Sequence, residues 1–160
     1  DAQKYYETAG KTINIDHHVS NTGTGQINHI RPEVGSTCEL VYDLMEPERL
    51  DTDMAMALYV GMIHDTGVFQ YSNTTPATLE KAARLIGHGF DFPRLIAETF
   101  YQKTYVQAQV MGSALMESIR FLDGTCIVSA IDRKTMDFYN VGPKDLDGIV
   151  SQLRNIEGVE

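Results

Sequence analysis

The chain has 160 residues, 42% of them hydrophobic and 22% charged, which is typical of a globular protein with one domain or one domain and part of another. Its formal net charge of −9 disfavours the broad basic surface that duplex nucleic acid requires, although bound divalent cations could still favour a phosphate-bearing substrate in one cleft. No apolar run is long enough to cross a bilayer, and the first residues lack a secretory pattern. We therefore expect a cytoplasmic protein without membrane contact, in which Cys38 and Cys126 are reduced thiols.

Two short segments in which apolar and polar residues alternate are predicted as strands, residues 11–16 and 26–30. Ile13 and Ile15 supply the alternation of the first segment. The sequence between the two segments, VSNTGTG, consists of turn-forming residues and predicts a loop. Pro32 is expected to end the second strand.

Helical periodicity, N-terminal caps and glycine or proline stops then predict a series of helices. Ser36 or Thr37 is expected to cap the first, and Asp51 or Thr52 the second. The second helix contains MAMALYVGMI, which is apolar almost all round and should be buried on several sides. The five helices are expected at residues 36–46, 51–66, 76–87, 91–100 and 105–122.

The last part of the chain differs in pattern, with a buried strand expected at residues 126–131 and two short helices at residues 132–139 and 144–156. A boundary between two parts is expected near residues 104–115. The predicted fold class is α/β: a mainly parallel sheet covered by helices, then a helical connector, then a smaller α/β lobe.

Three polar groups close the first predicted strand: Asp16, His17 and His18. Such groups are costly to bury unless something occupies them, and α/β folds place ligands at strand ends. Neighbouring strand side chains face opposite sides, so the two histidines are not expected to chelate the same ion. Asp16 shares a face with His18 and could fix the tautomer of an imidazole. A solvated strand end without function explains the same residues, and both interpretations stay open.

A second polar group follows the apolar helix, in the sequence HDTGVF. Asp65 lies at the C-terminal end of this helix, where the helix dipole disfavours an anion. One interpretation is an Asx-turn through Asp-Thr-Gly, and the other is a carboxylate held against a cation. Arg154, on the last expected helix, is either a solvated surface residue or a substrate-binding group.

The stretch INIDHHVSN, followed by GMIHDTGVFQYSNTT, resembles two signature motifs of the DHH family of metal-dependent phosphoesterases. Within that family the chain is similar to the two-domain bacterial enzymes that degrade very short RNAs and dephosphorylate 3′-phosphoadenosine 5′-phosphate. The resemblance implies a partial DHH domain in residues 1–104, a helical connector in residues 105–114, and a partial DHH-associated substrate-binding domain in residues 115–160.

The resemblance also implies a dinuclear site, usually manganese, with Mg²⁺ or Co²⁺ as possible replacements. His17 and Asp65 would ligate one metal, and imidazole with carboxylate is a ligand set that Mn²⁺ accepts. His18 would contact the substrate phosphate, and Asp16 would support it; these two are the expected catalytic residues. His18 and Arg154 are the expected substrate-binding residues.

The family's earlier motifs, which supply a histidine and further aspartates, have no counterpart before Asp16, and the glycine- and histidine-rich substrate motif is absent from the other end. We therefore expect a chain truncated at both ends that has little activity alone. The expected partner is a short RNA or small nucleotide, and a homodimer is possible because truncated sheet edges remain unpaired. Alternatives are a cyclic-dinucleotide phosphodiesterase, an exopolyphosphatase, or a non-catalytic binding fragment.

Overall fold

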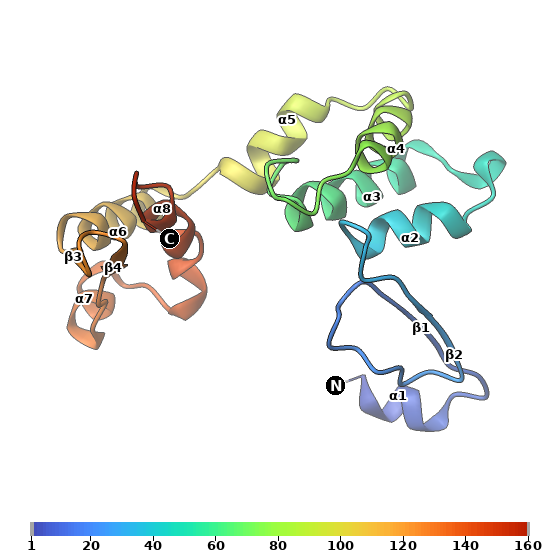
Figure 1. Cartoon of the computed structure of the whole chain (residues 1–160), viewed down its shortest axis with the longest axis horizontal. Coiled ribbons are helices and arrows are strands. Elements are labelled where there is room, and N and C mark those ends of the chain that lie inside the picture. The colour runs from blue at the N-terminus through green and yellow to red at the C-terminus, as the bar shows by residue number, and fades with distance from the viewer. Residues whose placement is uncertain (1, 160) are drawn as a thin grey trace. The chain divides into compact units, whose positions relative to one another are not determined.

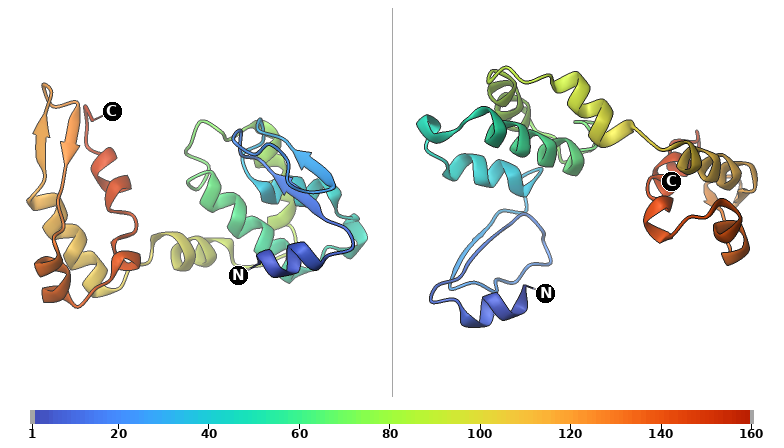
Figure 2. Two further views of the ribbon diagram at one scale, coloured as in Figure 1. Left: turned by 90° about the horizontal axis from the view of Figure 1, so that it is seen from below. Right: turned by 180° about the vertical axis from the view of Figure 1, so that it is seen from behind.

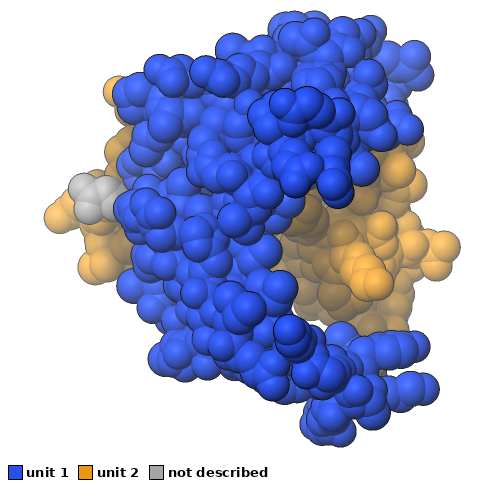
Figure 3. Space-filling view, turned by 90° about the vertical axis from the view of Figure 1, so that its right-hand side faces the viewer, with its two compact units in different colours: residues 1–102 blue, residues 103–160 orange. Residues whose placement is uncertain are grey.

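The computed structural model describes residues 2–159 and divides into two compact units, residues 1–102 and 103–160 (Figure 3). Each unit has its own core of buried side chains. Figure 1 gives the element labels used below, and each unit is described by itself.

The first unit opens on α1 (Gln3–Thr8), an exposed helix that the sequence did not predict. Strands β1 (Ile13–Asp16) and β2 (Ile27–Ile30) follow and pair in parallel, with Ile13 opposite Ile27 and Asp16 opposite Ile30. Both strand predictions are confirmed. In the described residues this sheet has two strands, and it ends where the DHH sequence begins.

Three helices form the core of the first unit: α2 (Thr37–Leu44), α3 (Thr52–Asp65) and α4 (Pro76–Ile86). Each begins at a side-chain cap, because Ser36, Asp51 and Thr75 accept hydrogen bonds from backbone amides of their first turns. The apolar α3 lies between the other two helices, as two views show (Figures 1 and 2). The buried core residues are Ala55, Leu58, Tyr59, Met62, Ile63, Ala82 and Leu85.

The first unit closes with α5 (Phe92–Ile96), which continues into a π-helical turn (Ala97–Tyr101). The helix predicted at residues 91–100 is therefore present, but its last turn is wider than an α-helix. Between α2 and α3, a single 3₁₀ turn (Pro47–Arg49) follows the predicted stop.

The second unit contains α6 (Tyr105–Met116), the antiparallel strands β3 (Ile119–Phe121) and β4 (Cys126–Val128), α7 (Arg133–Tyr139) and α8 (Ile149–Arg154). A 3₁₀ turn (Pro143–Leu146) precedes α8. The core of this unit is small and comes from α6 and α8. Its buried residues are Val110, Ala114, Ile149 and Leu153.

Three predictions in the second unit are wrong in their bounds. The helix expected at residues 144–156 is divided into the 3₁₀ turn and α8, because Gly148 between them has a positive φ. The helix expected to reach residue 122 ends at Met116, because the residues after it form a hairpin. Leu122, Asp123 and Gly124 all have positive φ and turn the chain back, which pairs β3 with β4. The strand expected at residues 126–131 ends at Val128, whose side chain is exposed instead of buried.

The boundary between the units falls after Gln102, just before the range of residues 104–115 in which it was expected. Helix α6 contributes Val110 and Ala114 to the core of the second unit, so residues 105–114 are part of that unit's packing. The assignment of the two regions to a DHH domain and a DHH-associated domain stays a prediction. Within residues 2–159, none of the helices combines the length and the apolar content needed to cross a membrane.

Candidate active site

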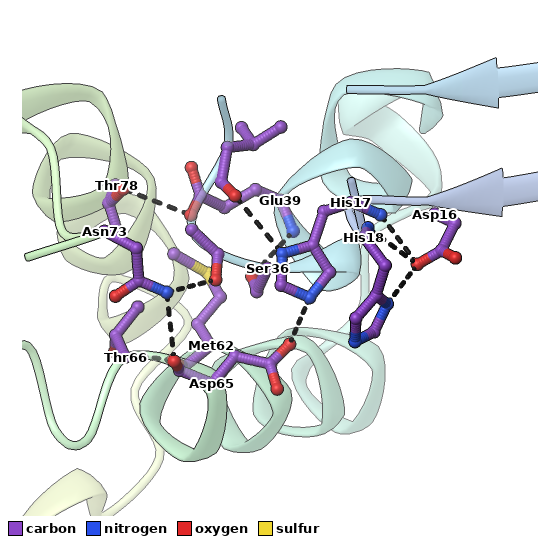
Figure 4. A network of polar contacts seen from close by, with 12 residues as sticks. Asp16, His17, His18, Ser36, Glu39, Met62, Asp65, Thr66, Asn73 and Thr78 are labelled. Atoms are coloured by element: carbon purple, nitrogen blue, oxygen red, sulfur yellow. Dashed lines mark hydrogen bonds and ion pairs between the residues drawn. The ribbon is translucent and has the colours of Figure 1, made fainter. Parts of the chain in front are cut away.

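The carboxylate of Asp16 organises the turn that follows β1 (Figure 4). Its Oδ1 accepts hydrogen bonds from the backbone N–H groups of His17 (2.7 Å) and His18 (3.2 Å), and its Oδ2 accepts one from the Asn21 amide (2.5 Å). The Asn21 contact first, and the His18 side chain second, hold the pKa of the Asp16 carboxyl well below its usual range. Asp16 therefore stays ionised and acts as an acceptor that shapes the turn.

His17 is held from both sides of its ring. Nδ1 lies 3.2 Å from the carbonyl oxygen of Val34, and because a carbonyl can only accept, the ring donates from Nδ1. Nε2 lies 3.4 Å from Oδ2 of Asp65, at the end of α3. A histidine whose Nδ1–H binds a backbone carbonyl presents its other nitrogen as a ligand, which is the usual arrangement at metal sites.

His18 is oriented by Asp16 and not by the protein core. Its Nδ1 lies 2.7 Å from Oδ1 of Asp16, while the side chain is 67% exposed. The hydrogen bond to Asp16 raises the pKa of His18 above its ordinary value. The sequence suggested that Asp16 could hydrogen-bond a neighbouring imidazole, and in the structure this imidazole is that of His18.

The prediction that His17 and His18 face opposite sides is wrong. Their ring centroids are 4.7 Å apart, because the strand ends at Asp16 and both backbone amides turn toward its carboxylate. The two histidines still have different neighbours, since His17 meets Asp65 and His18 meets Asp16.

Asp65 points at His17 instead of closing its own turn. That turn is held by Thr66, whose hydroxyl donates to the Met62 carbonyl (2.6 Å) and accepts from the Phe69 amide (3.1 Å). The next three residues, Gly67, Val68 and Phe69, all have positive φ, which is a strained conformation for valine. Of the two interpretations left open for Asp65, the geometry favours a carboxylate available to a cation.

A buried polar network lies behind these residues, and the sequence did not predict it. Glu39 is fully buried, accepts a hydrogen bond from Thr78 (3.1 Å), and lies 3.8 Å from the ammonium of Lys81, which also pairs with Asp43 at 2.7 Å. In the sequence Glu39 reads only as an acid in a first helical turn. Its burial follows from the packing of α2 against α4, which periodicity alone does not reveal.

The donor set at His17 and Asp65 fits one divalent cation in part. One imidazole nitrogen and one carboxylate oxygen converge, and both are ligand types that Mn²⁺ accepts. Within residues 2–159, no cluster of three or more His, Cys, Asp or Glu side chains could hold an ion alone. Arg154 lies exposed on α8 in the second unit, and its role in substrate binding stays a prediction.

Residues 1–62 match the family model described as the DHH family, N-terminal domain. Over these residues the chain is similar to the DHH family. The match contains Asp16, His17 and His18 and ends three residues before Asp65. It confirms the family that the two sequence motifs indicated.

Curated relatives extend the likeness over most of the chain's length. A bifunctional oligoribonuclease and PAP phosphatase NrnA from Thermus thermophilus is 30% identical over 152 residues, which are 93% of this chain and 45% of the relative. The protein of the same name from Bacillus subtilis is 24% identical over 159 residues, which are 96% of this chain and 50% of the relative. The chain therefore spans about half the length of the curated relatives it matches.

The fold is also that of a solved structure. An exopolyphosphatase-related protein from Bacteroides fragilis aligns with a TM-score of 0.87 at 23% identity, covering 95% of this chain and 46% of that protein. At this identity the likeness shows the fold alone. It confirms the predicted α/β class, with helices and two small two-stranded sheets in the described residues.

Proposed function

We propose that this chain is part of a metal-dependent phosphohydrolase whose full-length form hydrolyses short oligoribonucleotides, 3′-phosphoadenosine 5′-phosphate, or both. The observation that carries the proposal is the short distance, 3.4 Å, between Nε2 of His17 and Oδ2 of Asp65. His17 directly follows strand β1, and Asp65 is the last residue of α3. The substrate class is supported by relatives that are named oligoribonuclease and PAP phosphatase.

In this proposal His17 and Asp65 hold one Mn²⁺, with Mg²⁺ or Co²⁺ as replacements. The Val34 carbonyl keeps the His17 ring in the tautomer that leaves Nε2 available. When bound, such a cation lowers the pKa of a coordinated water and neutralises charge on a phosphoryl oxygen. A second metal and further ligands would come from residues outside this chain.

His18 is the proposed contact to the substrate phosphate. Its ring is exposed, so a phosphate oxygen can approach it, and Asp16 fixes the ring's direction through Nδ1. Asp16 thus acts through His18 and through the turn. The role of Arg154 in substrate binding stays a prediction. A homodimer and a cytoplasmic location stay predictions.

Removing His17 should weaken metal binding. We expect the chain to bind Mn²⁺ weakly, and His17→Ala and Asp65→Asn to lower the affinity about tenfold or more, because each removes one of two converging donors. Isothermal titration of Mn²⁺ into the 160-residue chain measures this. His88→Ala is the control, since His88 lies beyond α4 and should leave the affinity unchanged. Equal affinities for the wild type and the His17 variant would contradict the metal site.

The substrate class is tested by a panel of short RNA, 3′-phosphoadenosine 5′-phosphate, cyclic dinucleotide and polyphosphate. We expect no turnover by the 160-residue chain alone with Mn²⁺, because two ligands do not complete a two-metal site. A longer protein that contains these residues should prefer the first two substrates and lose activity on His17→Ala. Turnover by the isolated chain would contradict the incomplete site, and preference for polyphosphate would contradict the substrate class.

A further inference from the structure

One side chain joins the two backbone segments that carry the proposed metal ligands. The amide nitrogen of Asn73 donates to the carbonyl oxygen of Gly35 (3.0 Å) and to the carbonyl oxygen of Asp65 (3.1 Å) (Figure 4). Asn73 lies in the polar loop before α4, far in sequence from Gly35. Its NH₂ group therefore links the loop before α2 to the end of α3.

Both linked segments act directly on the site. The residue before Gly35 is Val34, whose carbonyl accepts the Nδ1–H of His17. Asp65 supplies the carboxylate that faces the same ring. His17 is therefore connected to Asp65 through three hydrogen bonds. The first joins the His17 ring to Val34, which is covalently bonded to Gly35, and the other two join Asn73 to Gly35 and to Asp65.

The orientation of the Asn73 amide follows from its neighbours. Both partners are carbonyl oxygens, so only the NH₂ end can face them. Its Oδ1 is consequently buried without a hydrogen-bond partner in the described residues. A buried acceptor without a partner is uncommon in folded proteins and calls for an explanation, and here the double contact on the NH₂ side supplies one.

Close packing also restricts the loop before α2, at Gly35. A Cβ at Gly35 would lie 2.8 Å from Oε1 of Glu39 and 2.9 Å from the backbone oxygen of Asn73, closer than real Cβ atoms approach. Gly35 therefore lies between the buried carboxylate and the Asn73 segment with no room for a side chain. The position of Asn73 is set by tertiary packing, not by a flexible surface loop.

We propose that Asn73 is a positioning residue that sets the separation of His17 and Asp65 for a single divalent cation. This inference rests on the proposed function, because the ligand pair is the one proposed there. Asn73 itself touches neither the ion nor the substrate. Residues that hold metal ligands in place commonly change affinity by about ten- to a hundredfold when they are replaced.

The test compares Asn73→Ala with Asn28→Ala, its matched control. Asn28 also bridges backbone groups in the first unit, but both of its contacts are to Gly25, away from His17. Isothermal titration of Mn²⁺ should give about tenfold weaker binding for Asn73→Ala and wild-type binding for Asn28→Ala. Thermal melting should show similar losses of stability for the two variants, which separates positioning from a general loss of fold.

A second readout needs no metal. Nuclear Overhauser contacts between the ring protons of His17 and the β protons of Asp65 should be present in the wild type and in Asn28→Ala, and lost in Asn73→Ala. Asn73→Asp keeps the shape and removes both donors, so it should lose the same contacts if the alanine variant fails to fold. Retention of these contacts in a folded Asn73 variant, or wild-type affinity, overturns the inference.

The two proposals fail in different ways. If neither the wild type nor the His17 variant binds Mn²⁺, the metal site is wrong, while the nuclear Overhauser contacts still decide whether Asn73 positions the pair. If His17→Ala weakens binding and Asn73→Ala does not, the metal site stands and the role of Asn73 is overturned.

Discussion

Replacing Lys81 by methionine should destabilise the first unit by about 3 kcal/mol or more. Glu39 is fully buried, and the ammonium of Lys81, 3.8 Å from its Oε2, is the cation paired with it. Oε2 has no hydrogen bond in the described residues, so loss of Lys81 leaves a buried carboxylate with Thr78 as its side-chain partner. Removing one partner of a buried pair costs more than removing both, because the remaining charge is desolvated without compensation.

The double variant Lys81→Met/Glu39→Gln should therefore recover most of this loss, since the amide carries no charge and can still accept from Thr78. Arg94→Met is the control: Arg94 pairs with Glu98 on an exposed helix face, where such pairs contribute about 0.2–1 kcal/mol. Urea unfolding, combined with hydrogen exchange of α3 amides, measures the free energy of the first unit by itself. Additive losses in the double variant would contradict a coupled buried pair.

The second large effect is expected at Gly61, in the middle of α3. A Cβ at this position would overlap Sγ of Cys38 on α2, so the two helices approach each other without a side chain between them. Alanine is better than glycine in a helix by about 1 kcal/mol, but overpacking costs about 1–3 kcal/mol. The clash is severe, so we expect Gly61→Ala to destabilise the first unit by about 2 kcal/mol in urea unfolding.

Cys38→Ala removes the atom that the new methyl group would meet. Gly61→Ala in that background should be less destabilising than alone, and a double-mutant cycle measures the difference. Gly112 on α6 gives the opposite control, because a Cβ there has no neighbour within 4 Å and Gly112→Ala should stabilise by about 0.5–1 kcal/mol. An unchanged cost of Gly61→Ala after removal of the thiol would rule out this contact as the cause.

Elements with local signals were predictable from the sequence. Ser36, Asp51 and Thr75 cap their helices through their own side chains, so the starts of α2, α3 and α4 follow from a few neighbouring residues. The hairpin of β3 and β4 was missed although its turn contains Asp123-Gly124, a common hairpin signal, because helical spacing of apolar residues runs on to Leu122. This spacing predicted a helix where the chain forms strand β3.

In the candidate site, too, contacts between sequence neighbours were predictable and contacts between distant residues were not. The contact of Asp16 with His18 lies within two residues of sequence and was predictable. The ring of His17 takes its direction from Val34 and Asp65, which only the folded chain brings near it. Glu39 and Asn73 gave no signal as single residues, since an acid in a first turn and an asparagine in a loop are common.

The proposed ligands come from two different layers of the first unit, one from the end of a strand and one from the end of a helix. An ion held by both would close a loop of the chain between residues 17 and 65 and so act as a removable cross-link. At a free ion concentration of about 100 times the dissociation constant, binding to the folded state alone would add about 2.7 kcal/mol of stability. The melting temperature of the first unit would then report the supply of metal, and chelation would loosen the strand pair from the helices.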